Sequence, residues 1–449
     1  MATERRTIAR HAGTLLVGQL AVMAFGVTDT IVAGRYSQQA LAALSVGSAV
    51  YVSIFVGLMG VLQALLPTWA ELHGGGRGPE IGRSVRQALY LAGVTMAIGV
   101  VALFFPGPLL EWTEVPHALQ AEVREYLSVL TLALPAALLL RMYSTLNQSL
   151  GKPLLVTWLQ TGSLMVKIPL SIWFAFGGLG LEPRGAVGCA WATVVVNWLF
   201  ILVAFWLVRS QPLYRPYAIW QPMERPDWRV IGRFARLGIP GGLAIMVEVT
   251  SFTLMALFIA RQGTLASAAH QVVSNLAAVL FMTPMSIGIA TSARVSYWLG
   301  AGDPRRARQT IRTGFKMAMA LSLGLSAATL LARHGIAGVY AKTPEVAALA
   351  ATLLAWLALF HLGDAAQAVL VWVLRCYRVV LAPLVAYCVL LWGVGLAGGY
   401  LLAYHGIGPL PPQNSPVAFW QASTVALLLL APILFTILWR AVRQAQARP

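Results

Sequence analysis

Charged residues are scarce in this chain of 449 residues. Only 10% of the positions are Asp, Glu, Lys or Arg, while 58% are hydrophobic and the mean hydropathy is +0.73. Soluble globular proteins carry about 25% charged residues. The deficit therefore argues against a soluble domain and predicts an all-α integral membrane protein, because apolar runs of this kind cross a bilayer as helices.

Paired cysteines and enzyme signatures are also missing. The three cysteines show no CxxC spacing, and we interpret them as small apolar packing residues: Cys189, Cys376 and Cys388. The sequence contains no GxxxxGK[ST], HExxH or GxSxG stretch and no Asp-rich pair for a metal-bound diphosphate. We therefore expect neither an enzyme nor a cofactor, and ATP does not power the protein directly.

What the chain has in abundance is long apolar runs. Runs of roughly 18 or more residues are typical of transmembrane helices, and counting them between charged or Gly/Pro-rich breaks gives twelve. The predicted spans are 11–34, 41–70, 86–106, 126–149, 154–176, 186–208, 232–260, 265–298, 313–332, 345–374, 379–404 and 417–439.

The net charge of +17 is distributed unevenly along the chain. With the N-terminus in the cytoplasm, most Lys and Arg residues fall in cytoplasmic loops, above all 209–236 and 305–312, whereas outer loops hold mostly single cations. This is the positive-inside pattern. It predicts a multi-pass protein of the inner membrane with both termini cytoplasmic and no cleaved signal peptide, and it explains the charge without nucleic acid.

Two cytoplasmic loops reveal an internal repeat. Residues 70–88 (AELHGGGRGPEIGRSVRQA) resemble residues 296–314 (SYWLGAGDPRRARQTIRTG), about half a chain apart. Pro79 and Pro304 suit the first position of a helix, and Asp303 suits an N-cap.

The repeat predicts two six-helix lobes related by a pseudo-twofold axis along the membrane normal. We place the N-terminal lobe at 1–208, a cytoplasmic connector at 209–231 and the C-terminal lobe at 232–449. Rocking of two such lobes can open a central cleft alternately to either side.

Three acids lie well inside apolar helices: Asp29, Glu248 and Asp364. One central acid costs roughly 2.5–3.5 kcal/mol on insertion scales. The three should therefore face a cavity or one another, and structural pairing or protonation would also satisfy them. A proton, a sodium ion or an organic cation can each neutralise such a carboxylate, so competition for it provides a chemical basis for antiport.

At these residues the sequence resembles a known family. VTDTIVAGR, GIPGGLAIMVEVTSF, LGAGDPRRARQ, FHLGDAAQAVLVWVLR and PRGAVGCAWATVVVNW look like the multidrug and toxic compound extrusion (MATE) transporters, NorM-type branch. The resemblance runs over nearly the whole chain. It implies a secondary antiporter that exports amphipathic, mostly cationic drugs or toxins in exchange for Na+ or H+, and hence a role in antibiotic resistance.

By position, the resemblance makes Asp29 the coupling, cation-binding acid of the first lobe, and Glu248 and Asp364 the coupling-cation ligands of the second. It implies no cofactor beyond the coupling ion. The partners expected are a small cationic substrate and membrane lipid, with no nucleic acid, and the protein is expected to be a monomer.

Two positions depart from the family pattern. Lys167 stands where NorM-type sequences often have a neutral asparagine, and we expect it to pair with Asp29, although it could instead snorkel or bind backbone carbonyls. Phe281 falls where some relatives place a tyrosine, so no tyrosine–cation contact is expected there, although a phenyl face also attracts cations.

Other polar and soft residues are further candidates. His361 lies three residues before Asp364 and could tune it or be an ordinary core histidine. Gln271 and Asn275 suit a polar cavity wall or interhelical hydrogen bonds. Methionines that could line an adaptable substrate cavity, or simply pack, are Met246, Met255 and Met282.

The sequence leaves two alternative functions open. A lipid-linked oligosaccharide flippase of the same superfamily would need a more cationic cavity than three acids and one lysine provide. A non-transporting membrane sensor is disfavoured because only short loops lie outside the helices. The charge of the cavity lining separates these classes, since an acidic lining favours cation export and a basic one a flippase.

Overall fold

The computed structural model describes residues 2–107, 117–178, 180–340 and 343–447. Within these ranges the chain forms helices, with two isolated β-bridges in its loops and no named strand. Every one of the twelve predicted spans corresponds to a helix or a run of adjoining helices, most of them longer than predicted. The all-α membrane fold is therefore confirmed.

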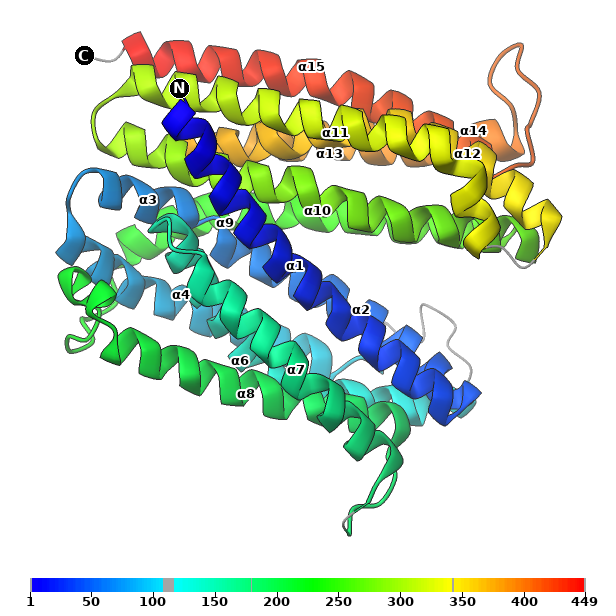
Figure 1. The fold of residues 1–449 in the computed structure, drawn as a ribbon, viewed down its shortest axis with the longest axis horizontal. Coiled ribbons are helices and arrows are strands. Elements are labelled where there is room, and N and C mark those ends of the chain that lie inside the picture. The colour runs from blue at the N-terminus through cyan, green and yellow to red at the C-terminus, as the bar shows by residue number, and fades with distance from the viewer. Residues whose placement is uncertain (1, 108–116, 179, 341–342, 448–449) are drawn as a thin grey trace. The chain divides into compact units, whose positions relative to one another are not determined.

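The first half of the chain begins with the long helix α1, and the second half with α9 (Figure 1). The first half comprises α1 (Ala2–Tyr36), α2 (Gln38–Gln63), α3 (Leu66–Gly74), α4 (Gly78–Phe104), α6 (His117–Ser149), α7 (Leu154–Phe176), α8 (Gly185–Ser210) and the 3-10 helix η1 (Pro212–Tyr217). The second half comprises α9 (Trp228–Ala260), α10 (Thr264–Gly300), α11 (Pro304–Tyr340), α12 (Pro344–Cys376), α13 (Leu381–Tyr387), the π-helix η2 (Cys388–Ala397), α14 (Gly398–Tyr404) and α15 (Val417–Ala447).

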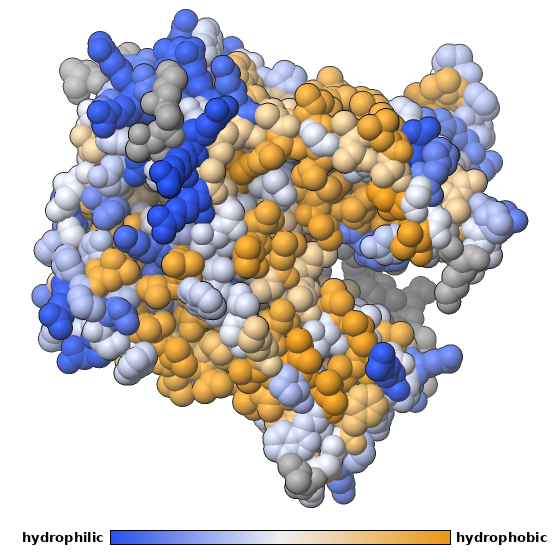
Figure 2. All heavy atoms as spheres, viewed as in Figure 1, coloured by the Kyte–Doolittle hydropathy of each residue, from blue (hydrophilic) through white to orange (hydrophobic). Residues whose placement is uncertain are grey.

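Eleven helical segments of the described chain are long and apolar enough to cross a membrane. The predicted span outside this set is α7, whose 23 residues include the polar Gln160 and Lys167. Figure 2 shows hydrophobic side chains over the middle lengths of α10 and α11, and hydrophilic side chains gathered around the starts of α1 and α11. This banding is what a bilayer requires of helices that cross it.

The contacts divide the chain into two compact units. We call Thr14–Gly242 the N-terminal unit, and Met1–Gly13 together with Leu243–Pro449 the C-terminal unit. Two helices change unit along their length, since α1 passes from one to the other after Gly13 and α9 does so after Gly242.

Each unit is built around its own central helix. In the N-terminal unit α6 packs against α2, α3, α4 and α8, and in the C-terminal unit α12 packs against α10, α11 and α15. Consequently α12 is almost entirely buried from Gly363 to Cys376, and any polar side chain there must find partners inside the protein.

The repeated loops adopt the same backbone turn. Gly76 and Gly302 have φ of 68° and 75°, the left-handed conformation that glycine adopts without strain. The next residue in each loop donates its N–H to a carbonyl five residues back, Arg77 to Leu72 at 3.0 Å and Asp303 to Trp298 at 2.9 Å, as in a Schellman helix end. The Asp303 side chain accepts the Arg306 N–H at 2.9 Å, which confirms the predicted N-cap.

The connector after α8 is held firmly on α4 within the N-terminal unit. Arg86, only 3% exposed, donates to the carbonyl oxygens of Ala218 at 2.7 Å and Ile219 at 3.3 Å, and to Glu224 Oε1 at 2.7 Å. Tyr90 donates its hydroxyl to the Glu224 carbonyl at 2.7 Å. The connector is thus an ordered strap rather than a free linker.

Candidate cation and substrate site

One face of α9 carries an acid and three side chains that suit an organic ligand. The side chains in question belong to Ser251, Phe252 and Met255. They lie three, four and seven residues after Glu248, so all four residues share one side of the helix. The apolar helix around them supplies no other charge until Arg261, which leaves the carboxylate to be satisfied by neighbouring helices.

The second acid comes from the central helix α12. Asp364 is 6% exposed, and Gln367, three residues further on, is 1% exposed. The Gln367 amide nitrogen donates to Glu248 Oε1 and to Asp364 Oδ1, both at 3.0 Å. Its amide oxygen in turn accepts from the Tyr387 hydroxyl of α13. One amide therefore bridges the two carboxylates and is itself held in orientation.

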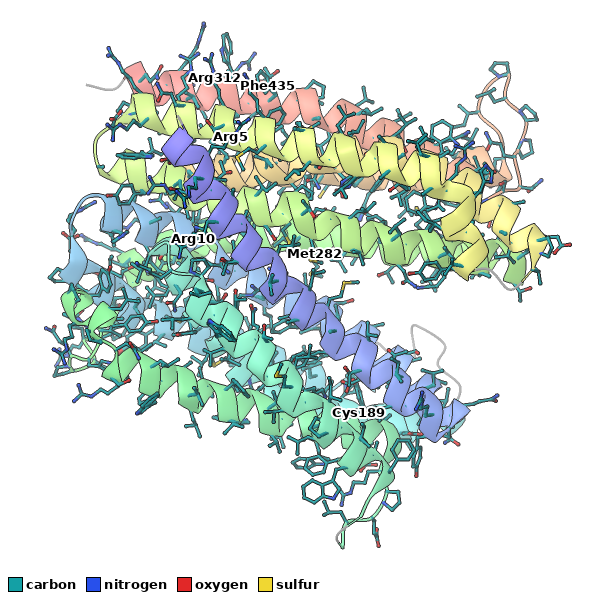
Figure 3. The ribbon with its side chains drawn as sticks, viewed as in Figure 1. Arg5, Arg10, Cys189, Met282, Arg312 and Phe435 are labelled. Atoms are coloured by element: carbon teal, nitrogen blue, oxygen red, sulfur yellow. The ribbon has the colours of Figure 1, made fainter. Side chains whose placement is uncertain are left out.

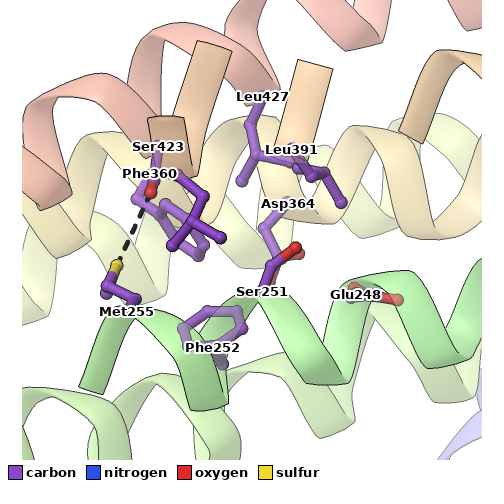
Figure 4. A pocket seen from close by; sticks show the side chains of 10 residues that line it. Glu248, Ser251, Phe252, Met255, Phe360, Asp364, Leu391, Ser423 and Leu427 are labelled. Carbon is purple, nitrogen blue, oxygen red and sulfur yellow. Dashed lines mark hydrogen bonds between the residues drawn. The ribbon is translucent and has the colours of Figure 1, made fainter. Parts of the chain in front are cut away.

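A small pocket with a cavity volume of about 30 Å³ lies over these two acids, entirely within the C-terminal unit. Its lining residues come from α9, α12, η2 and α15 and are Glu248, Ser251, Phe252, Met255, Phe360, Asp364, Leu391, Leu396, Ser423 and Leu427. Figure 4 shows Asp364 and Ser251 between the phenyl ring of Phe252 and the leucines. The lining combines acids with rings and aliphatic groups, the chemistry that attracts an amphipathic cation, while the cavity in this conformation has room for a water-sized particle or a small ion.

The π-helix contributes directly to this lining through Leu391 and Leu396. A π-helix has more residues per turn than an α-helix, and such segments occur often at functional sites. Trp392, also in η2, donates its indole N–H to the Val247 carbonyl at 3.3 Å, next to Glu248. This irregular segment therefore packs beside the acid-bearing face of α9.

Of the three predicted cavity methionines, only Met255 lines this pocket. Met246 is 41% exposed, because a separation of nine residues puts it on the opposite side of α9 from Met255. Met282, marked on α10 in Figure 3, and Phe281 are half-buried and lie outside the lining.

The remaining polar candidates have other surroundings. His361 is 1% exposed, and the described residues give its Nε2 no hydrogen-bond partner. Gln271 and Asn275 are exposed and bond to each other, Nε2 to Oδ1 at 2.9 Å. Neither pair member lines the acid pocket.

The pair Glu248 and Asp364 offers oxygen atoms to a hard cation. Within the described part of the chain, no group of three or more His, Cys, Asp or Glu side chains could hold a metal ion. A transition-metal centre therefore finds no ligand set there. Carboxylate, hydroxyl and amide oxygens suit a proton or a small hard cation instead.

The predicted contact between Lys167 and Asp29 is present in the N-terminal unit. Lys167 Nζ lies 2.9 Å from Asp29 Oδ1 and donates to the Cys189 carbonyl at 2.8 Å and the Thr193 hydroxyl at 2.7 Å. Ser171 donates its hydroxyl to Asp29 Oδ1 at 3.0 Å. Cys189, marked near the start of α8 in Figure 3, thus takes part through its backbone carbonyl, and its buried thiol also contacts Asp29.

Comparison with known proteins identifies the family. The MatE family model matches residues 15–173 and 240–401. The chain belongs to the MATE family of membrane transporters. Its relatives include the "Probable multidrug resistance protein NorM" of Aromatoleum aromaticum, 40% identical over 96% of this chain and 93% of the relative. Another is the "Multidrug resistance protein PmpM" of Pseudomonas aeruginosa, 33% identical over 98% and 92%.

Solved MATE structures share the fold. The eukaryotic MATE transporter AtDTX14 superposes with a TM-score of 0.86, at 20% identity, over 100% of this chain and 99% of that one. The bent form of the Vibrio cholerae MATE transporter VcmN gives a TM-score of 0.83, at 17% identity, over 99% and 98%. The two-lobed helical MATE fold therefore extends over this chain.

Proposed function

We propose that this MATE protein is a secondary active antiporter that exports amphipathic, mostly cationic small molecules in exchange for Na+ or H+. The observation that carries the proposal is the pocket of the C-terminal unit, where Glu248 and Asp364 meet Phe252, Phe360 and Met255. The carboxylates attract the positive charge of a substrate, the rings attract its cationic or aromatic part, and the thioether adapts to different shapes.

Substrate export is coupled to ion entry because the substrate and the coupling ion compete for the same two carboxylates, Glu248 and Asp364. Without a bound cation, two negative charges bridged by the single amide of Gln367 repel each other in a low-dielectric site. A proton or sodium ion relieves this repulsion, and so does a cationic substrate. Because either species can satisfy the same pair, binding of one favours release of the other, which is the requirement for exchange.

The residues that line the pocket also favour cation export over a flippase, a sensor or an enzyme. Among the ten residues that line the pocket, two are acids and none is Lys or Arg. A flippase that holds a pyrophosphate-linked lipid would need cations there. A membrane sensor or an enzyme would have no need of an acidic and aromatic pocket inside the membrane.

Further properties belong to the same proposal. The protein acts as a monomer in the inner membrane, with both termini in the cytoplasm, with lipid as its surroundings and with no cofactor beyond the coupling ion. The transport lobes are the repeats 1–208 and 232–449, joined by the connector 209–231, and they alternate access as the repeat predicts.

Efflux measurements test the proposal. Proteoliposomes loaded with a fluorescent organic cation should lose dye when a sodium or a proton gradient is applied, each in the absence of the other. Glu248→Gln and Asp364→Asn should each abolish the gradient-driven part while the protein remains folded in the membrane. An anionic dye of similar size is the control. Normal cation efflux by either variant would exclude this pair as the coupling site.

A further inference from the structure

The Lys167 ammonium of α7 is enclosed by oxygen atoms inside the N-terminal unit. Its side chain is 0% exposed, and its three N–H groups can be assigned to Asp29, the Cys189 carbonyl and the Thr193 hydroxyl, at 2.7–2.9 Å. An ammonium has three donors and no acceptor. These distances are those of charge-assisted hydrogen bonds, so every donor of this cation is used.

Asp29 is satisfied by the same arrangement. Its Oδ1 receives both the lysine ammonium and the Ser171 hydroxyl, and the residue is 9% exposed. A buried charge without a partner would be costly, whereas a close pair with hydrogen bonds is tolerated. The carboxylate already has the positive charge that an acid at this depth needs.

The two acid-bearing sites therefore differ in charge. The site of the N-terminal unit joins one acid to one lysine and is neutral as a pair. The pocket of the C-terminal unit brings two acids together with no Lys or Arg among its lining residues. Even with the buried Arg375 that interacts with Glu248, two acids leave the second arrangement with a net negative charge that an external cation can neutralise.

We propose that the Lys167 ammonium is a built-in occupant of the cation position at Asp29, so that the N-terminal unit binds no exchangeable Na+ or H+. This inference rests on the proposed antiport function and narrows it, because exchange then uses Glu248 and Asp364 alone. Lys167 acts as a specificity-determining residue, since its ammonium stands where a free ion would otherwise bind the carboxylate. Replacing it by an uncharged side chain should open a cation site at Asp29.

Cation binding to the purified full-length chain in nanodiscs tests this. Bound radioactive sodium is counted at equilibrium, and protonated carboxyl groups are followed by their infrared C=O band between acidic and alkaline buffer. In the variant Glu248→Gln/Asp364→Asn, both signals from buried acids should fall to background although Asp29 is intact. Adding Asp29→Asn should change neither signal further. A cation signal that survives the double variant and disappears with Asp29→Asn would overturn the inference.

A second set of variants tests the role of the lysine itself. Adding Lys167→Met to the Glu248→Gln/Asp364→Asn background should restore a sodium or carboxyl-proton signal, and Asp29→Asn should remove it again. Lys167→Arg keeps the charge and is the matched control, which should restore nothing. A Lys167→Met protein that melts cooperatively yet gains neither signal would contradict the occupant role. A failure of the proposed function looks different, because the unmodified protein would then bind no coupling cation at all.

Discussion

At the scale of single residues, Gln367 holds the acid pair together. Its amide donates to both Glu248 and Asp364 and is oriented by Tyr387. Hydrogen bonds to charged groups contribute about 1.5–3 kcal/mol each. The geometry of the two carboxylates, and hence their affinity for a shared cation, should depend on this one side chain.

We expect Gln367→Leu to lower the cation concentration that gives half-maximal efflux by roughly ten- to a hundredfold, because the carboxylates lose the donor that stabilises their charged, cation-free form. Sodium- and pH-dependent efflux from proteoliposomes measures the shift. Tyr387→Phe is the matched control, since it removes only the hydroxyl bond to Gln367 and should have a smaller effect. An unchanged concentration dependence in Gln367→Leu would show that the bridge has no part in cation binding.

The sequence predicted the acids of the site but only part of their surroundings. Ser251 and Phe252 were missed although they lie three and four residues after Glu248, so helical periodicity alone could have found them. His361 and Gln367 are both three residues from Asp364, and spacing cannot tell which one reaches Glu248 on another helix. That choice depends on how α9 packs beside α12.

At the scale of elements, the connector strap and a tight helix contact fix the N-terminal unit. The strap depends on Arg86, whose buried guanidinium bonds two connector carbonyls and Glu224. The hydrogen bond from Arg86 lowers the pKa of the Glu224 carboxyl below its usual value. An acid with a lowered pKa stabilises the fold above its unfolded-state pKa, and this contribution is lost as the pH falls through the lowered value.

We therefore expect Arg86→Gln to speed hydrogen exchange of connector amides 218–225 by about tenfold or more at neutral pH, since each lost bond is worth about 0.5–1.5 kcal/mol. Mass spectrometry of the exchanged peptides reports this directly. Arg83→Gln is the control, because Arg83 pairs with the same Glu224 at 3.2 Å but its side chain is 63% exposed and exposed pairs contribute little. In the unmodified protein, the protection of these amides relative to their intrinsic exchange rate at each pH should fall as the pH is lowered through the lowered pKa of Glu224. Slow exchange in Arg86→Gln would mean that other contacts hold the strap.

The tight contact joins α9 to α2 at Gly242. A Cβ atom on Gly242 would lie 2.5 Å from the Gly57 carbonyl oxygen, a backbone atom that cannot rotate away. Gly242→Ala should therefore force the helices apart and destabilise the protein by about 1–3 kcal/mol, read as a lower melting temperature in detergent. Gly232→Ala in the same helix is the matched control, because its Cβ would meet nothing within 4 Å. Equal melting temperatures would argue that α9 can shift without cost.

The internal structure of one membrane span could not be predicted from the sequence. The span 379–404 was expected as one ordinary helix, whereas the structure contains α13, the π-helix η2 and α14. Apolar composition indicates that a segment crosses the membrane, but the wider turn of the π-helix η2, which packs against α15, leaves no mark in hydropathy.

At the scale of the whole molecule, twelve spans and a repeat could be inferred because the bilayer demands long apolar helices. The division into the N-terminal and C-terminal units could not be inferred from the sequence. Met1–Gly13 packs with the C-terminal unit, where Glu4 receives Arg294 Nε at 2.9 Å, Trp298 Nε1 at 3.1 Å and Thr310 Oγ1 at 3.2 Å. Nothing in the first thirteen residues indicates partners so distant in the chain.

Glu4→Gln should lower the melting temperature of the protein, because the bidentate bond from Arg294 loses its charge, a loss of about 1.5–3 kcal/mol. Arg5→Gln is the neighbouring control, since Arg5 is exposed and should be replaceable without effect. Thermal unfolding of both variants in nanodiscs provides the comparison. If the two variants melt together with the unmodified protein, the Glu4 contacts do not stabilise the C-terminal unit.

The placement of Glu4 also sets the order of events during synthesis. Arg294, Trp298 and Thr310 follow it by 290, 294 and 306 residues along the chain. At ribosomal speeds of roughly 5–20 residues per second, the first turns of α1 wait about 15–60 s for the helices that bind them. Although Glu4 leaves the ribosome well before α10 and α11, the segment around it is therefore among the last to reach its final contacts.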